Sequence, residues 1–410
     1  MSDAFRQSTK GRVRHGIFCY LDLAAVIQER ALVSPTLSFR FGSGIVRRWA
    51  GCLLVVAVSG ADPESPPPKT ADDAAVQRLI RQLGSEDFEE REKAIKDLVE
   101  IGAPALEALR RAAVSEDAEV ARRAKGCLPE IERDVKVLAF AVRLTAKSAK
   151  ERNGAALALY DFGQGAHKAL PALIAALDDP DPVVRNTVVL ALAALGPASE
   201  PVVPKLIRML QDKSQGDSVR WSIAVSLGGR GPSGREAIPV LLHILETEGA
   251  QMQNGAANAL GDLGKFDKRV IPALIKASEH ESGKVNGAAA GALLNLAIEP
   301  DLCIPALVKY MKKHKGDREY DHARNYIAFG MGRFGAAAKP AIPFLIEMVT
   351  DMNESDRVRS GAVDGLANIG SEAKVAVPIL RETLKTLPAS GNHRLQGAII
   401  DALDAFAKLR

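Results

Sequence analysis

Residues 170–196 read LPALIAALDDPDPVVRNTVVLALAALG, two apolar patterns separated by a short acidic turn. The second pattern begins at Arg185 and places Val188, Val189 and Leu192 three, four and seven positions later. These offsets put the apolar side chains on one face of an α-helix. The stretch therefore predicts a helix, a turn and a second helix with a buried face.

The Arg185 pattern returns about every 30 to 38 residues along the chain. A period of this length is typical of proteins built from stacked helical repeats. No stretch after residue 61 alternates polar and apolar residues as a half-buried strand would, so we expect an all-α fold. The register position of the pattern is held by Arg91, Arg152, Arg185, Arg220, Arg324 and Arg359, and it continues with Ala121, Gln253, Asn286 and, more loosely, Gln396.

A second column of motifs supplies the partner helix of each repeat. It reads Pro-x-Leu-aliphatic, and because proline suits the first turn of a helix, we expect these prolines to open the first helices. They are Pro171, Pro204, Pro239, Pro272, Pro305 and Pro343, with weaker copies at Pro104 and Pro378. Aspartates three or four residues before the register position are expected to cap the second helices. They are Asp87, Asp117, Asp181, Asp217, Asp321 and Asp356.

These motifs, read as Ala-x-Pro-x-Leu-Ile, Asp-x-x-Val-Arg-x-x-Ala and Leu-Gly, resemble the HEAT-repeat family, in the variety found in phycobilisome-lyase-like proteins. The resemblance runs from about Val76 to the end of the chain. It implies an all-α fold, a right-handed α-α superhelix or armadillo-like solenoid of about nine or ten helix pairs, over residues 72–410. HEAT arrays carry scaffolds, transport adaptors, chromophore lyases and a few DNA-repair enzymes, so the resemblance does not select a function.

One repeat lacks the proline signature, between Asp134 and Lys150. This repeat is irregular, so the superhelix can bend there. We expect its first helix to be built on Val135, Leu138, Ala139, Val142 and Leu144.

The N-terminal segment differs from the array. Arg47 and Arg48 precede an apolar run over residues 49–58, and the small residues Ser59, Gly60 and Ala61 follow. A basic, apolar and small-residue order is that of a signal peptide, and the apolar part is too short to span a bilayer.

We therefore expect residues 1–61 to be a leader in which residues 46–61 form the signal peptide of an exported, periplasmic or extracellular protein. The preceding residues 1–45 are too long and irregular for an ordinary basic region, so we expect initiation at Val46. The alternatives for the apolar run are a buried helix, with a cytoplasmic protein, or a membrane anchor. The proline-rich residues 62–71 are expected to form a stiff linker.

Loss of the leader changes the charge of the chain. Its 61 residues hold eight Lys or Arg and three Asp or Glu, so 46 of the 54 basic and 47 of the 50 acidic side chains remain. A neutral array offers no overall counter-charge to a polyanion, so nucleic acid is not the expected partner. Cys127 and Cys303 lie about five repeats apart, too far for a disulfide, and are expected to be core residues.

Motifs of the familiar catalytic classes are absent from the sequence. It contains no Gly-x-Ser-x-Gly, His-Glu-x-x-His, Walker-type loop or Cys-x-x-Cys. His314, Asp321 and His322 could hold a metal, but the same cluster fits a solvated loop in which Asp321 caps the next helix, which we favour. We therefore expect no catalytic residue, metal or cofactor.

The register arginines admit two roles. Guanidinium groups can line a groove for phosphate or carboxylate ligands. They can also pair with the capping aspartates of the same or the adjoining repeat, and we favour this structural ladder because aspartates stand near most of them. Its expected members are Arg91, Arg152, Arg185, Arg220, Arg324, Arg359, Asp181, Asp217 and Asp356.

The positions one and five residues after the register position face away from the predicted core. In HEAT-like arrays the second helices line the concave side, so we expect this row in a groove. Its amides can pair with the backbone of an extended peptide, similar to the asparagine row of armadillo proteins, or they can bond neighbouring turns. The expected partner-binding residues are Asn153, Asn186, Trp221, Asn254, Asn258, Asn325 and Phe329.

A repeat array has a large surface and no buried pocket by default, which favours interaction over chemistry. The sequence thus indicates a non-enzymatic scaffold that binds a protein or peptide in its concave groove, with no stable membrane span in the mature chain. The alternatives are a HEAT-type lyase or other enzyme acting on a chromophore or nucleic-acid base, and a cytosolic scaffold or regulator.

The leader makes a direct prediction. N-terminal sequencing of the protein from its native host should give a terminus near Asp62, because cleavage is expected after Ala61. Recovery of the cytosolic protein with Met1 intact would contradict export.

Overall fold

The computed structural model describes residues 71–387 and 393–409, so the expected leader and residues 62–70 of the expected linker lie outside the described residues. Every regular element within these two ranges is a helix, which confirms the predicted all-α solenoid. In the same part of the chain, no helix is both long and apolar enough to cross a membrane.

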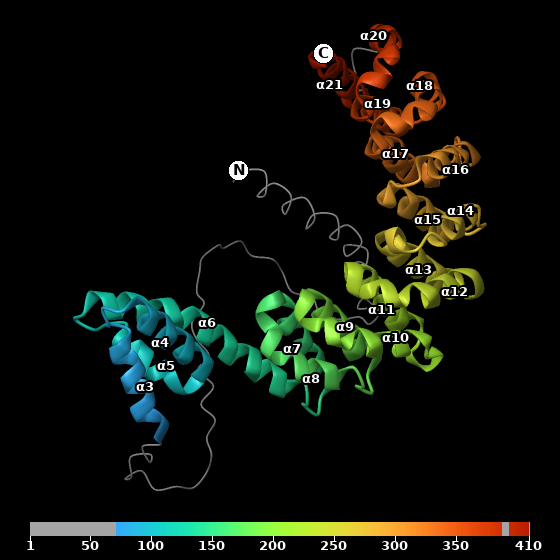
Figure 1. The fold of residues 1–410 in the computed structure, drawn as a ribbon. Coiled ribbons are helices and arrows are strands. Elements are labelled where there is room, and N and C mark those ends of the chain that lie inside the picture. Colours follow the sequence, from blue (N-terminus) through green and yellow to red (C-terminus); the bar gives the residue numbers. More distant parts are fainter. Residues whose placement is uncertain (1–70, 388–392, 410) are drawn as a thin grey trace, which may run out of the picture. The chain divides into compact units, whose positions relative to one another are not determined.

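The helices alternate between a first and a second helix of each repeat, and the second helices of successive repeats contact one another (Figure 1). The first helices are α3 (Ala71–Gln82), α5 (Leu106–Ala112), α8 (Leu170–Ala176), α10 (Val203–Gln211), α12 (Ile238–Thr247), α14 (Val270–Ser278), α16 (Pro300–Lys313), α18 (Ile342–Thr350) and α20 (Val377–Thr386). The second helices are α4 (Phe88–Ile101), α7 (Ala149–Asp161), α9 (Pro182–Ala194), α11 (Asp217–Gly228), α13 (Ala250–Leu263), α15 (Gly283–Leu296), α17 (Asp321–Gly330), α19 (Asp356–Ile369) and α21 (His393–Lys408).

The irregular repeat is explained by one long helix, α6 (Ala118–Arg143), which serves as a second helix and continues as the next first helix. The predicted set for this segment was right at Leu144, which is buried, but wrong at Leu138 and Val142, which are exposed, and it missed the buried Val137. An uninterrupted helix keeps one phase, so its first half fixes which side of its second half faces the core. The buried positions of α6 are Ala121, Ala124, Cys127, Ile131, Asp134, Val137 and Ala141.

Proline stands in the first turn of most first helices, where its missing N–H leaves no bond unmade. It occupies one of the first two positions of α8, α10, α12, α18 and α20. Pro305 was wrongly assigned, because it lies inside α16, which begins at Pro300.

The predicted aspartate caps are correct at three helices. The side chains of Asp87, Asp117 and Asp181 accept hydrogen bonds from the free N–H groups of α4, α6 and α9. The prediction was wrong at the other three, where the aspartate is the first helical residue and another residue precedes it as the cap. A carboxylate in the first turn still complements the helix dipole. These first-turn residues are Asp217, Asp321 and Asp356.

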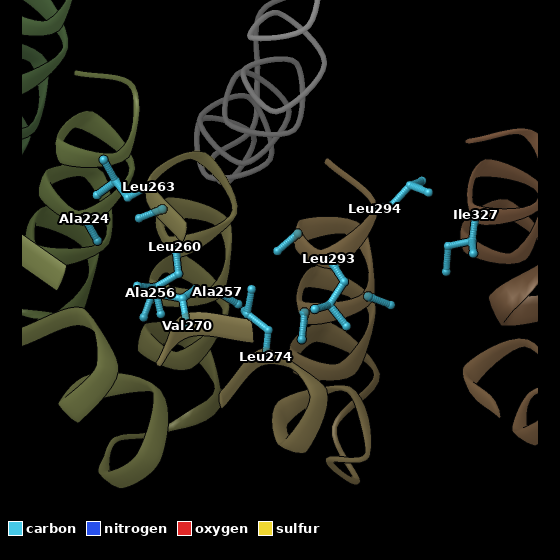
Figure 2. Close-up of a cluster of buried hydrophobic side chains, with 14 of the residues drawn as sticks. Ala224, Ala256, Ala257, Leu260, Leu263, Val270, Leu274, Leu293, Leu294 and Ile327 are labelled. Carbon is cyan, nitrogen blue, oxygen red and sulfur yellow. The ribbon is translucent and has the colours of Figure 1, made fainter. Parts of the chain in front are cut away.

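Small aliphatic side chains fill the space between first and second helices. Figure 2 shows Ala256, Ala257 and Leu260 of α13 beside Val270 and Leu274 of α14, and all five are buried. One such cluster runs from residue 137 to residue 406, and a second covers residues 76–131. Each helix pair therefore buries its apolar face against its neighbours, as in other repeat arrays.

Glycine lets neighbouring second helices come into backbone contact. A Cβ built on Gly228 would lie 2.7 Å from the Cα of Ala259, and one on Gly365 would lie 2.1 Å from the carbonyl oxygen of Ala328. The first helices of successive repeats pack less extensively than the second helices. Successive second helices therefore approach one another more closely than successive first helices do.

We expect Gly365→Ala to destabilise the protein by about 1–3 kcal/mol, because the new methyl group would displace the backbone of α17. Gly154→Ala is the matched control, since nothing lies within 4 Å of a Cβ at this exposed position of α7. It should be neutral or stabilise by about 0.5–1 kcal/mol, because alanine favours a helix over glycine. Urea unfolding followed by circular dichroism measures both, and equal effects would contradict close packing at Gly365.

Candidate functional site

Each register side chain from Arg220 to Arg359 donates a hydrogen bond to a carbonyl at or just beyond the end of its own first helix. The Nε of Arg220 donates to Leu210 O at 2.7 Å, and the Nε of Arg359 donates to Val349 O at 2.9 Å. These carbonyls lie in the last helical turn, where no backbone N–H can reach them. The side chain on the second helix thus ties it to the first helix of the same repeat.

The same bond persists where the register residue is not arginine. The amide of Gln253 donates to Leu245 O, and that of Asn286 donates to His280 O, both at 3.0 Å. Earlier in the array, Arg91, Arg152 and Arg185 donate to carbonyls of the turn that follows their first helix.

Three of the arginines also reach a carboxylate of the next repeat, and in each case both oxygens are bound. Arg152 binds Asp179 at 2.6 and 2.8 Å, and Arg220 binds Glu248 with two contacts of 2.7 Å. Arg324 binds Glu354 in the same way. Two parallel bonds of this kind are the strongest contacts that a guanidinium makes.

These carboxylates are not the aspartates that the sequence pattern suggested. Arg185 donates to Asp179 O and more weakly to Gln215 O, instead of pairing with Asp181 or Asp217. The contact between Arg220 and Asp217 is 3.6 Å and the one between Arg359 and Asp356 is 3.8 Å, so both are long. The observed partners Asp179, Glu248 and Glu354 stand 27, 28 and 30 residues after their arginines. This spacing is close to one repeat, so the pairs could have been found in the sequence.

Burial sets the chemistry of these pairs. Arg220, Arg324 and Arg359 are buried, so their guanidinium groups do not face solvent. The two bonds from Arg220 lower the pKa of Glu248, which keeps that carboxylate ionised at neutral pH. The geometry therefore joins repeats and presents no row of free guanidinium groups.

The amides one residue after the register position connect neighbouring second helices. The Nδ2 of Asn254 donates to Lys284 O at 2.8 Å, and that of Asn325 donates to Arg357 O at 2.6 Å. The Oδ1 of Asn153 accepts from the hydroxyl of Thr187 at 2.6 Å. We call the solvent-facing side of the second helices, which carries this row, the inner face.

Trp221 belongs to the same connection. Its indole lies over Gly255, where a Cβ would come within 2.7 Å of the ring, and its Nε1 donates to the Oδ1 of Asn254 at 3.3 Å. The side chain is half-buried. Asn258 donates to the same oxygen, whereas the buried Oδ1 of Asn186 has no protein partner.

Exposed apolar side chains lie on the inner face of two second helices, α17 with Phe329 and Tyr326 and α7 with Leu157, which is 47% exposed. Phe329 is 49 % exposed and Tyr326 is 39 % exposed. The hydroxyl of Tyr326 donates to the Oδ1 of Asn295 at 2.8 Å, and the same oxygen accepts from Arg333 at 2.7 Å. Sequence reasoning named Phe329 but missed Tyr326, because Tyr326 is two residues after the register position and outside the repeated column.

The polar cluster considered as a metal site is dispersed. His314 is buried with its ring 3.7 Å from that of Tyr320, whereas His322 is exposed on α17. Lys315 pairs with Glu347 and Asp351. Across the described ranges, no three His, Cys, Asp or Glu side chains come together as a metal site.

Comparison with known proteins agrees with the fold. A family model described as HEAT repeats matches residues 137–228 and 213–295. A chain of the Kap95:Nup1 complex is similar, with a TM-score of 0.52 and 14% identity, over 82% of this chain and 53% of that chain. Human deoxyhypusine hydroxylase in complex with glycerol is also similar, with a TM-score of 0.31 and 19% identity, over 68% of this chain and 99% of that chain. No curated protein matches.

The buried pair makes a stability prediction. Arg324→Met leaves Glu354 buried without its partner, so we expect a loss of about 3–5 kcal/mol, and Arg324→Met with Glu354→Leu should recover most of it. Arg185→Met should lose only about 1 kcal/mol, because its partners are carbonyls near the surface. Urea unfolding measures all three, and equal losses for Arg324→Met and Arg185→Met would refute the difference.

Proposed function

We propose that this chain, a HEAT-repeat solenoid, is a non-enzymatic scaffold that binds an extended segment of a partner protein along its inner face. The observation that carries the proposal is that Phe329 and Tyr326 of α17 keep 49% and 39% of their surface exposed, although the hydroxyl of Tyr326 bonds Asn295 of the preceding repeat. Large aromatic side chains that remain exposed on a rigid surface are frequent anchors of protein interfaces.

The polar groups of the inner face favour a partner segment whose side chains can donate hydrogen bonds to it. The amides of Asn254 and Asn325 are used between repeats, so they are not free to pair with a peptide backbone. Asp364 lies on the inner face of α19, at the same offset as Phe329, and burial raises its pKa. A carboxylate that is partly removed from water binds a cationic or amide donor more strongly than a hydrated one. An apolar residue followed by a basic residue therefore suits this surface.

Export is part of the proposal and rests on the sequence. The basic, apolar and small-residue order of residues 46–61 supports a signal peptide, and the near-neutral charge of the remaining chain suits a partner that is not a polyanion.

Phe329→Ala tests the binding surface. Peptides selected by phage display on the full chain should bind the variant more weakly by about 2 kcal/mol, roughly thirtyfold in Kd, because an anchor ring is lost. Isothermal titration calorimetry measures the difference. Phe88→Ala is the matched control, since Phe88 is 64% exposed at the start of α4, far along the sequence from α17.

Unchanged affinity of every selected peptide for the Phe329→Ala protein, with Tyr326→Ala equally silent, would show that the inner face of α17 is not the binding surface. Loss of binding in the Phe88→Ala protein would point to the opposite end of the array.

A further inference from the structure

The step from α15 to α17 has neither the arginine–carboxylate pair nor the amide-to-backbone bond found at other steps, and its polar contact is the Oδ1 of Asn295, which accepts from Tyr326 and Arg333. The register residue of α17 is Arg324, which reaches a carboxylate of the next repeat, but that of α15 is Asn286, which donates to a carbonyl of its own repeat. In α15 the position that corresponds to Asn254 and Asn325 is Gly287. Glycine has no side chain, so no amide bonds the next second helix from this position. Accordingly, α15 and α17 pack less extensively than α13 and α15.

A histidine stands where the missing carboxylate would be. His314 follows Asn286 by 28 residues, the same separation that joins Arg220 to its carboxylate partner. Its ring is stacked on Tyr320 and lies 4.8 Å from the ring of Tyr310. The ion pair is thus replaced by a cluster of neutral aromatic rings.

Buried polar atoms of this cluster lack protein partners. They are the Oδ1 of Asn286, the Oη of Tyr310 and the Nε2 of His314, in residues that are 0%, 2% and 8% exposed. A buried polar atom without a hydrogen bond opposes closure of the contact that buries it. This contact is therefore held less firmly than those closed by an arginine and a carboxylate.

The connection into α16 is strained as well. Ala297 and Glu299 adopt left-handed backbone conformations, with φ of 45° and 47°, which non-glycine residues rarely do. An open cavity of about 330 Å³ runs along α16, from Leu302 to Tyr310, and is closed on the other side by Ile275 of α14. Beside the Asn295 bonds, the contact across the step is made by apolar side chains such as Leu294, which extends from α15 toward the helix that carries Ile327 (Figure 2).

We propose that the contact between α15 and the α16–α17 pair is a hinge of the array, and that protonation of His314 opens it.

The groups around the ring determine the direction of the effect. Lys313 on α16 and Arg324 on α17 oppose a charge on His314, and Asp317 in the intervening turn favours it. Tyr310 and Tyr320 present phenol rings, and α15 presents Gly283 and Gly287, which do not ionise.

Burial, and then the charge of Lys313, lower the pKa of His314, so the closed contact holds the neutral ring. An opened ring returns to its ordinary pKa of about 6.5. The open form therefore binds the proton more readily, and the closed contact loses stability as the pH falls below about 6.5. Above that pH the contact keeps its full stability.

Hydrogen–deuterium exchange of the full chain, read by mass spectrometry and corrected for intrinsic rates, tests the hinge. Between about pH 6.5 and the lower pKa of the closed form, exchange in α15–α17 should accelerate by up to about tenfold for each unit of pH, because opening takes up one proton. Exchange in α11 and α13 should not follow this trend. A uniform response along the array would overturn the proposal without any variant.

His314→Gln keeps a polar side chain that does not titrate, so the pH dependence of exchange in α15–α17 should disappear. His322→Gln is the matched control, because His322 is exposed on the adjoining helix, and it should leave that dependence intact. Asn286→Arg with His314→Glu installs the pair found at Arg220 and should slow exchange across the step. Retention of the pH dependence in His314→Gln would show that another group controls the contact.

Discussion

The array depends on one interaction, the hydrogen bond from a register side chain to a carbonyl at the end of the first helix of its own repeat or in the turn that follows it. A helix leaves its last carbonyls without partners, and a solenoid ends a helix at every half-repeat. Arg220, Gln253, Arg324 and Arg359 each satisfy such a carbonyl from the second helix, and Asn286 satisfies one in the turn that follows α14. The angle between the two helices of a repeat is thereby fixed by a polar bond inside an otherwise apolar core.

The length of the register side chain then decides how strongly one repeat holds the next. Arginine has donors left after it binds the carbonyl, so Arg220 and Arg324 also bind Glu248 and Glu354 across the repeat boundary. Glutamine and asparagine are too short for both tasks. Repeats of one fold can therefore differ in stiffness, and the step after Asn286 combines the short side chain with unpaired polar atoms. Each repeat of such an array contacts only its neighbours, so a weak contact at one step can open while the other steps stay closed.

The polar side chains of the inner face are likewise used in bonds between repeats. Amides that a sequence pattern offers to a ligand are used in Asn254 and Asn325 to connect second helices that glycine has brought close. What is left for a partner are the side chains that do not fit the repeated column, above all Phe329 and Tyr326. In the proposed scaffold, specificity for a partner would therefore come from the departures from the repeat and not from the repeat itself.

The sequence by itself determined the helical period, the pairing of helices and most of the buried face, because these depend on local spacing and on which side chains avoid water. The sequence did not predict the buried face of α6, because nothing in the spacing shows that two expected helices join into one continuous helix. Only the tertiary structure decided the partners of the arginines, since Asp179, Glu248 and Glu354 are chosen by the stacking of one repeat on the next. It also decided which amides are free, because a hydrogen bond between repeats depends on how closely two backbones approach, and that distance is set by packing between residues far apart in the chain.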